Sequence, residues 1–457
     1  MNELSRANLT LAYLVAVLLL GGASAAGQAG NFALQVTGAA LIGWTLFSRT
    51  RVETLHTGLR WFAIGVAVLV AVQFLPLPAA LWPSLPGRDT VAEGFKLLGV
   101  PVPWFTLSLA PWASLAGLTW WIPALALFLA LREEGAPPTR HIVLVIAGVA
   151  GLSVALGAVQ RVAGSGYLYL ITNYGTGPGF FANSNHQGSF LLCALALWGA
   201  YMADKQQSSR VRRSASWTSG PQAVLAAVGL LLLMGVLVSG SLACVALLFP
   251  VMGAFALTLR PDWRVPLPLV LLAMVATVAG LALFLLYGPI ANDLTAKGTV
   301  AGISRQEFLI TGSRILKDFA PFGSGLGTFP DLYRWYENPA LVGTTFVNHA
   351  HDDLLELLIE TGVFGLAALG LFFGWFVPRA WAVWSGDRKA PYQLAASVVI
   401  TAELLHSLVD YPLRTAAMSS VMAIACVLLV RPSEVRSSGR PMGKPNVSDT
   451  DSGMIRI

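Results

Sequence analysis

Titratable side chains gather in one short stretch of this sequence, residues 348–360. Two of the six histidines, His349 and His351, lie here two positions apart. Four carboxylates follow within nine positions: Asp352, Asp353, Glu356 and Glu360. A histidine beside a carboxylate can act as a general base, because the carboxylate orients the imidazole and stabilises the proton that it receives. Proton transfer is therefore the first chemistry that this stretch suggests.

The local sequence places both histidines just before a helix. Asp353 and Glu356 precede an apolar run, which is the pattern of an N-cap residue and its partner three positions later. We therefore predict a helix that begins near Asp353 and continues into the apolar segment 361–377. The positive end of a helix dipole favours a neutral imidazole, which is available as a base, and Asp352 or Glu356 could orient it. A helix that began at His349 would instead place that histidine on one face with Glu356.

Three interpretations of this stretch are open. The histidines could serve only to cap and pack the turn. A His-x-His pair with adjacent carboxylates could bind a metal ion, although the sequence shows no further ligand near it. A histidine could act as the base in a group transfer. We favour the third interpretation.

Basic residues in the same part of the chain could bind an anionic substrate. Arg305 opens a predicted amphipathic helix from Ser304 to Phe319, and a guanidinium can hold a phosphate through two parallel hydrogen bonds. Arg314 follows nine positions later, about 180° around an ideal helix, so these two arginines cannot face one ligand. Arg161, at the end of a predicted span, either extends toward lipid headgroups or binds a ligand.

Two further polar patches separate apolar segments. Residues 179–187 offer neutral hydrogen-bonding groups of the kind that bind sugar hydroxyls, although a turn with a helix cap would use the same residues. The substrate-binding candidates of this patch are Asn183, Asn185 and His186. Residues 406–415 contain Asp410 and Arg414, which could bind substrate or pair with each other across the turn between two spans.

The surrounding sequence is typical of a membrane protein. Of 457 residues, 55% are hydrophobic and 11% are charged, whereas soluble domains contain about 25% charged residues. The mean hydropathy is +0.67. We predict an all-α polytopic membrane protein with about twelve transmembrane helices. The predicted spans are 9–26, 30–48, 60–80, 113–131, 141–160, 187–203, 222–239, 241–259, 266–287, 361–377, 393–409 and 415–430.

The distribution of basic residues indicates which side each loop faces. If the N-terminus is cytoplasmic, every short loop on the cytoplasmic side is basic, as the positive-inside rule requires. Both termini are then cytoplasmic, and residues 348–360 and Arg305 face the opposite side. The net charge of +6 is interpreted through the positions of the basic residues relative to the membrane, and it does not indicate a nucleic-acid partner.

The first apolar segment has an alternative interpretation. Together with the small residues Ala23-Ser24-Ala25-Ala26, it resembles a cleavable signal peptide. The next apolar segment follows almost at once, which favours a retained span.

Two loops on the outer side are long. Residues 82–112 are rich in proline and tryptophan and are predicted to form a cap on the membrane surface. Residues 288–352 form a partly helical loop of about 65 residues, which is too long for a simple connector. We predict one transmembrane domain, 1–431, that contains this loop, followed by a disordered cytoplasmic tail, 432–457.

Several motifs together resemble those of the O-antigen ligase/polymerase family. The run H-A-H-D-D-L-L-E-L-L-I-E-T-G-V-F-G from His349 resembles the family signature, which usually has Asn in place of Asp352. The segment S-R-Q-E-F-L and then P-F-G-S-G-L-G-T-F from Pro321 resemble its Arg-containing helix and Gly-rich turn. The segment F-F-A-N-S-N-H-Q from Phe180 is similar to its Asn-x-Asn motif. The resemblance covers about 140–430.

This resemblance implies an inverting, metal-independent glycosyltransferase of the bacterial inner membrane, with its active site facing the periplasm. Such enzymes move a glycan from an undecaprenyl-diphosphate carrier to an acceptor hydroxyl. The resemblance implies that His351 is the catalytic base, with His349 as the alternative, and that Arg305 binds the donor diphosphate. The expected partners are that donor, a lipid A-core, glycan or protein acceptor, and membrane lipids. No cofactor and no nucleic acid are expected.

One position departs from the family pattern. Many members carry an arginine after Ser-Gly-Ser at the start of the eighth span, where this chain has Leu242. Arg161 or Arg414 could replace that arginine, or the donor could differ.

The alternative function is a transporter of solutes or lipid-linked glycans without transfer chemistry. A transporter would need charged or broken helices near the middle of the membrane. The predicted spans are nearly free of charge, with Glu403 and His406 as the main exceptions close to one outer end. Polar chemistry confined to one face favours an enzyme.

Overall fold

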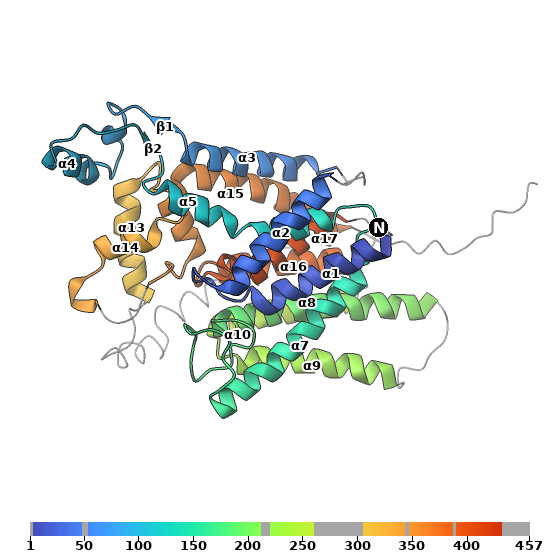
Figure 1. Ribbon diagram of the computed structural model, residues 1–457. Coiled ribbons are helices and arrows are strands. Elements are labelled where there is room, and N and C mark those ends of the chain that lie inside the picture. The colour runs from blue at the N-terminus through green and yellow to red at the C-terminus, as the bar shows by residue number, and fades with distance from the viewer. Residues whose placement is uncertain are drawn as a thin grey trace, which may run out of the picture.

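The computed structural model describes residues 3–47, 54–211, 220–259, 305–342, 347–386 and 390–431. These residues are mostly helical, which confirms the predicted all-α class (Figure 1). The strands β1 (Pro76–Leu77) and β2 (Phe105–Thr106) form one short antiparallel pair. The predicted tail, 432–457, lies outside the described residues.

Helices occupy the predicted spans, except 266–287, which lies outside the described residues. They are α1 (Glu3–Leu20), α2 (Ala29–Phe47), α3 (Thr57–Gln73), α5 (Pro111–Thr119), α6 (Ile122–Ala130), α7 (Thr139–Ala163), α8 (Ser184–Val211), α9 (Gly220–Val238), α10 (Leu242–Leu259), α15 (Asp353–Ser385), α16 (Pro391–His406) and α17 (Ala416–Val430). Among the described residues, four stretches are long and apolar enough to cross a membrane: Pro111–Ala130, Thr139–Ala163, Leu242–Leu259 and Asp353–Ser385. The twelve-span topology and its orientation stay predictions.

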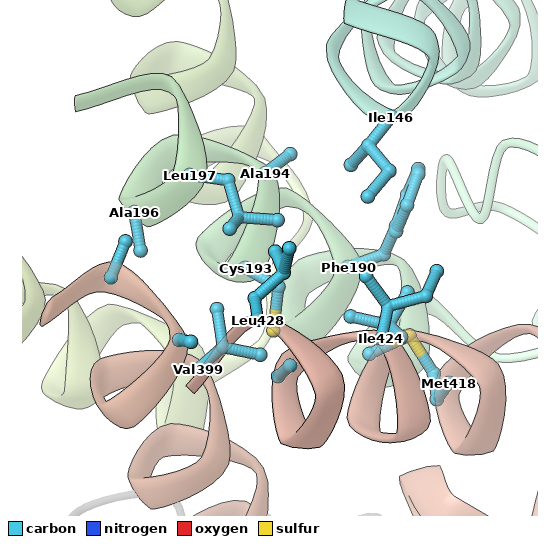
Figure 2. Packing of buried hydrophobic residues seen from close by; sticks show 14 of the residues in the cluster. Ile146, Phe190, Cys193, Ala194, Ala196, Leu197, Val399, Met418, Ile424 and Leu428 are labelled. Atoms are coloured by element: carbon cyan, nitrogen blue, oxygen red, sulfur yellow. The ribbon is translucent and has the colours of Figure 1, made fainter. Parts of the chain in front are cut away.

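Helix α8 forms the centre of the bundle. Every residue from His186 to Tyr201 is buried, because α7, α10, α16 and α17 all pack around this part of the helix. A helix that is buried on all sides needs apolar side chains all round, which residues 190–200 supply. Figure 2 shows this packing, with Phe190 and Leu197 of α8 among side chains from α7, α16 and α17.

Helix α1 begins and ends earlier than the predicted span 9–26. It ends before Gly21 and Gly22 because the chain passes close to other backbone there. A Cβ atom on Gly22 would overlap the carbonyl oxygen of Phe180. The side chains of Leu14 and Val17 are fully buried, so α1 is part of the core.

The shorter elements gather at one end of the bundle, on the left in Figure 1, which we call the site end. They include η1 (Trp82–Ser84), α4 (Asp89–Leu97), α13 (Arg305–Phe319) and α14 (Phe329–Tyr336). Helix α13 confirms the predicted amphipathic helix within the long loop. Its buried face, which includes Ile315, packs against α14 and the start of α15.

Gly362 divides α15 into two segments. Its φ of 55° and ψ of −136° are not helical, which corrects the prediction of one continuous helix from Asp353 into the apolar segment. The Gly-rich turn, residues 321–327, fills the break. The backbone N–H groups of Ser324 and Gly325 donate to the carbonyls of Ile359 and Glu360, at 3.0 and 2.8 Å. The turn therefore satisfies carbonyl groups that the interrupted helix leaves open.

We expect Gly362→Ala to destabilise the protein by at least about 1–3 kcal/mol, because side chains rarely adopt this backbone conformation. The added Cβ would also overlap the carbonyl oxygen of Pro321. Gly370→Ala in the same helix is the matched control, since a Cβ there meets no atom within 4 Å. Thermal unfolding in detergent measures both variants, and equal midpoints would contradict this account of the break.

The segment 82–112 holds the Gly-rich turn in place. Arg88 is fully buried, and its guanidinium donates to the carbonyls of Leu107 at 2.7 Å and Gly323 at 2.8 Å. Burial lowers the pKa of Arg88 to about 10. The predicted surface cap is thus tied directly to the turn that fills the break in α15.

Candidate active site

Two histidine–carboxylate pairs lie at the start of α15. His349 Nδ1 is 2.9 Å from Glu356 Oε1, and His351 Nδ1 is 3.4 Å from Asp410 Oδ1. Both carboxylates are buried, whereas the side chains of His349 and His351 keep 14% and 28% of their exposure. Each carboxylate orients one ring nitrogen and leaves Nε2 for a substrate.

The turn that carries the histidines is held by several backbone contacts. His351 has a φ of 54°, which is unusual for a residue with a side chain and costs about 1–3 kcal/mol. The N–H of Ala350 donates to Glu356 Oε2 at 2.8 Å, and the N–H of Asp353 donates to the carbonyl of Ser407 at 2.8 Å. These two bonds hold the backbone on both sides of His351 in place.

The ring of Tyr411 contacts three imidazoles. Its centroid lies 4.9, 4.6 and 4.8 Å from the ring centroids of His186, His349 and His351. On another side, the ring of Phe308 from α13 lies 4.9 Å from that of His351. His351 is therefore packed between α13 and the segment that joins α16 to α17.

Asp410 accepts hydrogen bonds mainly from neutral groups. Asn185 Nδ2 donates to its Oδ2 at 2.5 Å, and the N–H of Tyr411 donates to its Oδ1 at 3.0 Å. His186 Nε2 lies 3.9 Å from the same Oδ1 atom. Burial alone would raise the pKa of Asp410, but the hydrogen bond from His351 and the nearby imidazoles hold this pKa well below its ordinary value. Asp410 is thus an anion that can stabilise an imidazolium.

Arg414, in the 3₁₀ turn η3 (Pro412–Arg414), binds three carboxylates of α15. Its Nε lies 3.2 Å from Asp353 Oδ1. Its Nη1 lies 3.2 Å from Glu356 Oε1 and 3.4 Å from Glu360 Oε2. Burial would lower the pKa of Arg414, but these carboxylates outweigh it and raise the pKa above its ordinary value. The suggested pairing of Asp410 with Arg414 is wrong, because each binds a different partner.

The comparison with known families identifies the part of the chain that carries the histidines. Residues 226–370 match the family described as O-antigen ligase. This segment of the chain is similar to that family. This confirms the resemblance seen in the motifs. No curated protein matches the chain.

The matched segment does not complete the site by itself. It contains both histidines and Glu356, but Asp410, Arg414 and Asn185 lie outside it. The carboxylate partner of His351 and the cation near His349 therefore come from flanking parts of the chain.

The structure brings the segment 183–186 to this site. Asn183 Oδ1 accepts from the N–H of Asn185 at 2.9 Å, and the side chain of Asn185 reaches Asp410. Asn183 therefore caps α8, as the sequence suggested, and Asn185 also contacts the site. His186 is fully buried beside Tyr411, which leaves it little surface for a substrate.

The other two arginines proposed as ligands differ in position. Arg161 is exposed in the last turn of α7 and makes no hydrogen bond or ion pair with another described residue. The structure does not bring it to the histidines through any contact. Arg305 is the first residue of α13, one turn before Phe308, and its side chain lies outside the described part of the chain.

Asp352 caps α15 and does not orient a histidine. Its Oδ1 accepts from the N–H of Leu355 at 3.0 Å, so the N-cap is one residue earlier than the predicted Asp353. Burial raises the pKa of Asp352. Asn and Asp are about equally good N-caps, so Asp in place of the usual family Asn preserves this function.

Three polar groups at the site were not proposed as site residues from the sequence. Asn348 Nδ2 donates to Ser24 Oγ at 3.2 Å. The ring of Tyr411 packs on His349 and His351. Ser24 belongs to the small-residue stretch after α1, and no local signal connects that stretch with residues more than 300 positions away. Asn348 precedes His349 and Tyr411 follows Asp410 in the sequence, and this adjacency to proposed residues was the only sign that they lie at the site.

Metal ligands are not grouped in the ranges that the structure describes. No three His, Cys, Asp or Glu side chains there are arranged as a metal ion requires. Metal independence stays a prediction.

Proposed function

We propose that the protein is a glycosyltransferase that moves a glycan from an undecaprenyl-diphosphate carrier to an acceptor hydroxyl at the periplasmic face of the inner membrane. The match to the O-antigen ligase family supports this reaction class. The observation that carries the proposal is His351, oriented by the buried anion Asp410 and still partly exposed. This is the arrangement that a general base requires.

The reaction is a single displacement. His351 Nε2 takes the proton of the acceptor hydroxyl while the acceptor oxygen forms a bond to the anomeric carbon of the donor sugar. The bond from that carbon to the diphosphate oxygen breaks, and the lipid diphosphate leaves with the electron pair. One displacement inverts the anomeric configuration. Asp410 stabilises the imidazolium that forms, as the carboxylate of a catalytic triad does.

The leaving group needs stabilisation of its negative charge. Arg414 is held by three carboxylates and is not available as the main diphosphate ligand. Arg305 remains the proposed ligand, because α13 begins one turn before Phe308, which packs on His351.

The surroundings of the two histidine pairs favour His351 over His349 as the base. Glu356 shares its charge between His349 and Arg414. Asp410 has no lysine or arginine partner among the described residues, and neutral donors bind it. More of its charge is therefore available to the imidazolium of His351.

Deletion of the gene, followed by gel analysis of surface polysaccharide, tests the proposed function. Accumulated unligated carrier-linked glycan would identify a ligase, and products of a single repeat unit would identify a polymerase. Restoration of the wild-type pattern by the intact gene is the control. Unchanged surface glycans would contradict the proposal.

A further inference from the structure

Six polar side chains form a buried ladder between α8 and α16. Within each set of three, the residues recur at positions i, i+3 and i+7, which places them on one face of the helix. At most 2% of each residue is exposed. The members are His186, Ser189 and Cys193 on α8, and Glu403, His406 and Asp410 on α16 and just beyond its end. We call this set the α8–α16 ladder.

The outer part of the ladder adjoins the candidate site. His186 Nε2 lies 3.9 Å from Asp410 Oδ1, the atom that also faces His351. One helical turn further into the bundle, Ser189 Oγ lies 2.9 Å from His406 Nδ1. The residues of the two helices thus pair in reverse order, and the ladder leads from Asp410 into the interior.

Glu403 forms the inner end of the ladder. It precedes Asp410 by seven positions, which is about 10 Å along a helix axis. Its Oε1 accepts from Cys193 Sγ at 2.9 Å and from Ser189 Oγ at 3.3 Å. Its Oε2 is buried and has no hydrogen-bond partner among the described residues. The part of the chain that the structure describes also contains no lysine or arginine in contact with Glu403.

We propose that Glu403 is a proton-binding site inside the bundle, and that its carboxyl group is uncharged in the folded protein. A carboxylate in the interior is costly unless cations or several strong donors compensate its charge, and without them the group binds a proton instead. Glu403 receives one hydroxyl and one weak thiol donor, both on the same oxygen. Its position in the predicted span 393–409 adds to the cost of a charge there.

The other titratable groups around Glu403 do not offer it a ready counter-ion. Among the described residues, only the imidazole of His406 could carry a positive charge. Charging His406 and Glu403 together would desolvate two ions on either side of the Ser189 hydroxyl, whereas the neutral pair avoids this cost. The groups on the other helices packed here are thiols or a further acid: Cys193 of α8, Cys244 of α10 and Asp353 of α15.

The two carboxyl groups of the ladder therefore have opposite roles. Asp410 accepts from the Asn185 amide and from the N–H of Tyr411, and it faces the imidazole of His351, so it is stable as an anion. Two acids whose surroundings differ in this way take different protonation states. The proton on Glu403 keeps a second negative charge out of the ladder, which leaves the anion at the outer end beside His351.

Infrared difference spectroscopy of the purified full chain in nanodiscs tests this protonation at about pH 7. An ordinary glutamate loses its proton near pH ~4.3 and would be ionised there. The spectrum of the wild type minus that of Glu403→Gln should contain the C=O stretch of a carboxylic acid. The stretch of a carboxylate in its place would overturn the proposal.

Two variants that keep Glu403 give the same information if Glu403→Gln does not fold. Ser189→Ala and Cys193→Ala each remove one hydrogen bond to Oε1. Each should move the carboxylic acid band to higher frequency, because a C=O group that accepts fewer hydrogen bonds is stiffer. A shift of a carboxylate band, with no carboxylic acid band moved, would contradict a proton on Glu403.

Matched controls carry the same substitutions at exposed positions. Glu93 of α4 is exposed, so Glu93→Gln should remove the bands of a carboxylate and no carboxylic acid band. Ser313 of α13 is also exposed, and Ser313→Ala should leave the band of Glu403 in place.

The pH dependence of unfolding gives a second readout. Above about pH 5 the folded protein keeps the proton of Glu403, whereas the unfolded chain releases it, so stability falls as the pH rises. Between about pH 5 and pH 7, each unit should raise the ratio of unfolded to folded protein up to tenfold more in the wild type than in Glu403→Gln. Equal pH dependence would overturn the proposal. Neither readout requires glycan transfer, so a failure of the proposed reaction would leave both results interpretable.

Discussion

His351→Ala should lower the rate of glycan transfer by about 10²–10⁴-fold, which is the usual contribution of a general base. Without the imidazole, the acceptor hydroxyl keeps its proton while its oxygen attacks, and the transition state carries uncompensated positive charge. Initial rates with a purified carrier-linked glycan and its acceptor would measure this loss. Alanine keeps the Cβ atom that causes the backbone strain at the positive φ of His351, so this strain should change little and the expected loss is one of rate.

Two further variants locate the base more closely. Asp410→Asn keeps a side chain of the same shape but removes the charge that stabilises the imidazolium, so transfer should fall, although less than in His351→Ala. His349→Ala should lower the rate of transfer less than His351→Ala does, because the charge of Glu356 is shared with Arg414. Wild-type transfer by His351→Ala, with a severe loss in His349→Ala, would assign the base to His349.

The sequence predicted best those features that depend on a local pattern of residues. Apolar length predicted where the helices lie, because a span needs a run of about 20 apolar residues wherever it packs. The concentration of titratable residues at 348–360 pointed to the candidate site, because two histidines and four carboxylates lie close together there. The start of α15 was also predicted, and only the cap differed, with Asp352 in place of Asp353.

The pairing of charges could not be predicted, because it depends on tertiary contacts. Three acidic residues within eight positions of α15 offered several partners to each histidine. Asp410, which follows His351 by 59 positions, reaches it only because α16 returns the chain to the same end of the bundle. Sequence proximity left a pairing of Arg414 with Asp410 open, but Arg414 instead contacts three carboxylates of α15.

The break in α15 was missed for a related reason. A glycine inside an apolar helix pattern is tolerated, so Gly362 carries no clear signal of a break. The break is stable because the distant Gly-rich turn supplies N–H groups to the freed carbonyls. That turn was recognised from its composition, but its partner in space was not.

Arg414→Ala should destabilise the protein by about 3–5 kcal/mol, the usual cost of removing one partner from a buried ion pair. Asp353, Glu356 and Glu360 would be left close together without their cation, and Glu356 and Glu360 are fully buried. Arg334→Ala is the matched control, because Arg334 and its partner Asp331 are 54% and 68% exposed. Exposed pairs contribute about 0–1 kcal/mol, so the control should unfold close to the wild-type midpoint.

A double variant separates the charge of Arg414 from its packing. Arg414→Gln with Glu360→Gln removes one charge of each sign, and the amide oxygen of the new glutamine can still accept from the N–H of Phe329, which lies 3.3 Å from Glu360 Oε1. If unbalanced charge causes the destabilisation, the double variant should be more stable than Arg414→Gln alone. The interaction energy between the two substitutions should then be about 0.5–3 kcal/mol. Additive effects would mean that Arg414 acts through packing. Glycan transfer by the double variant should follow its stability, because Glu356 then keeps its contacts with His349 and with the N–H of Ala350.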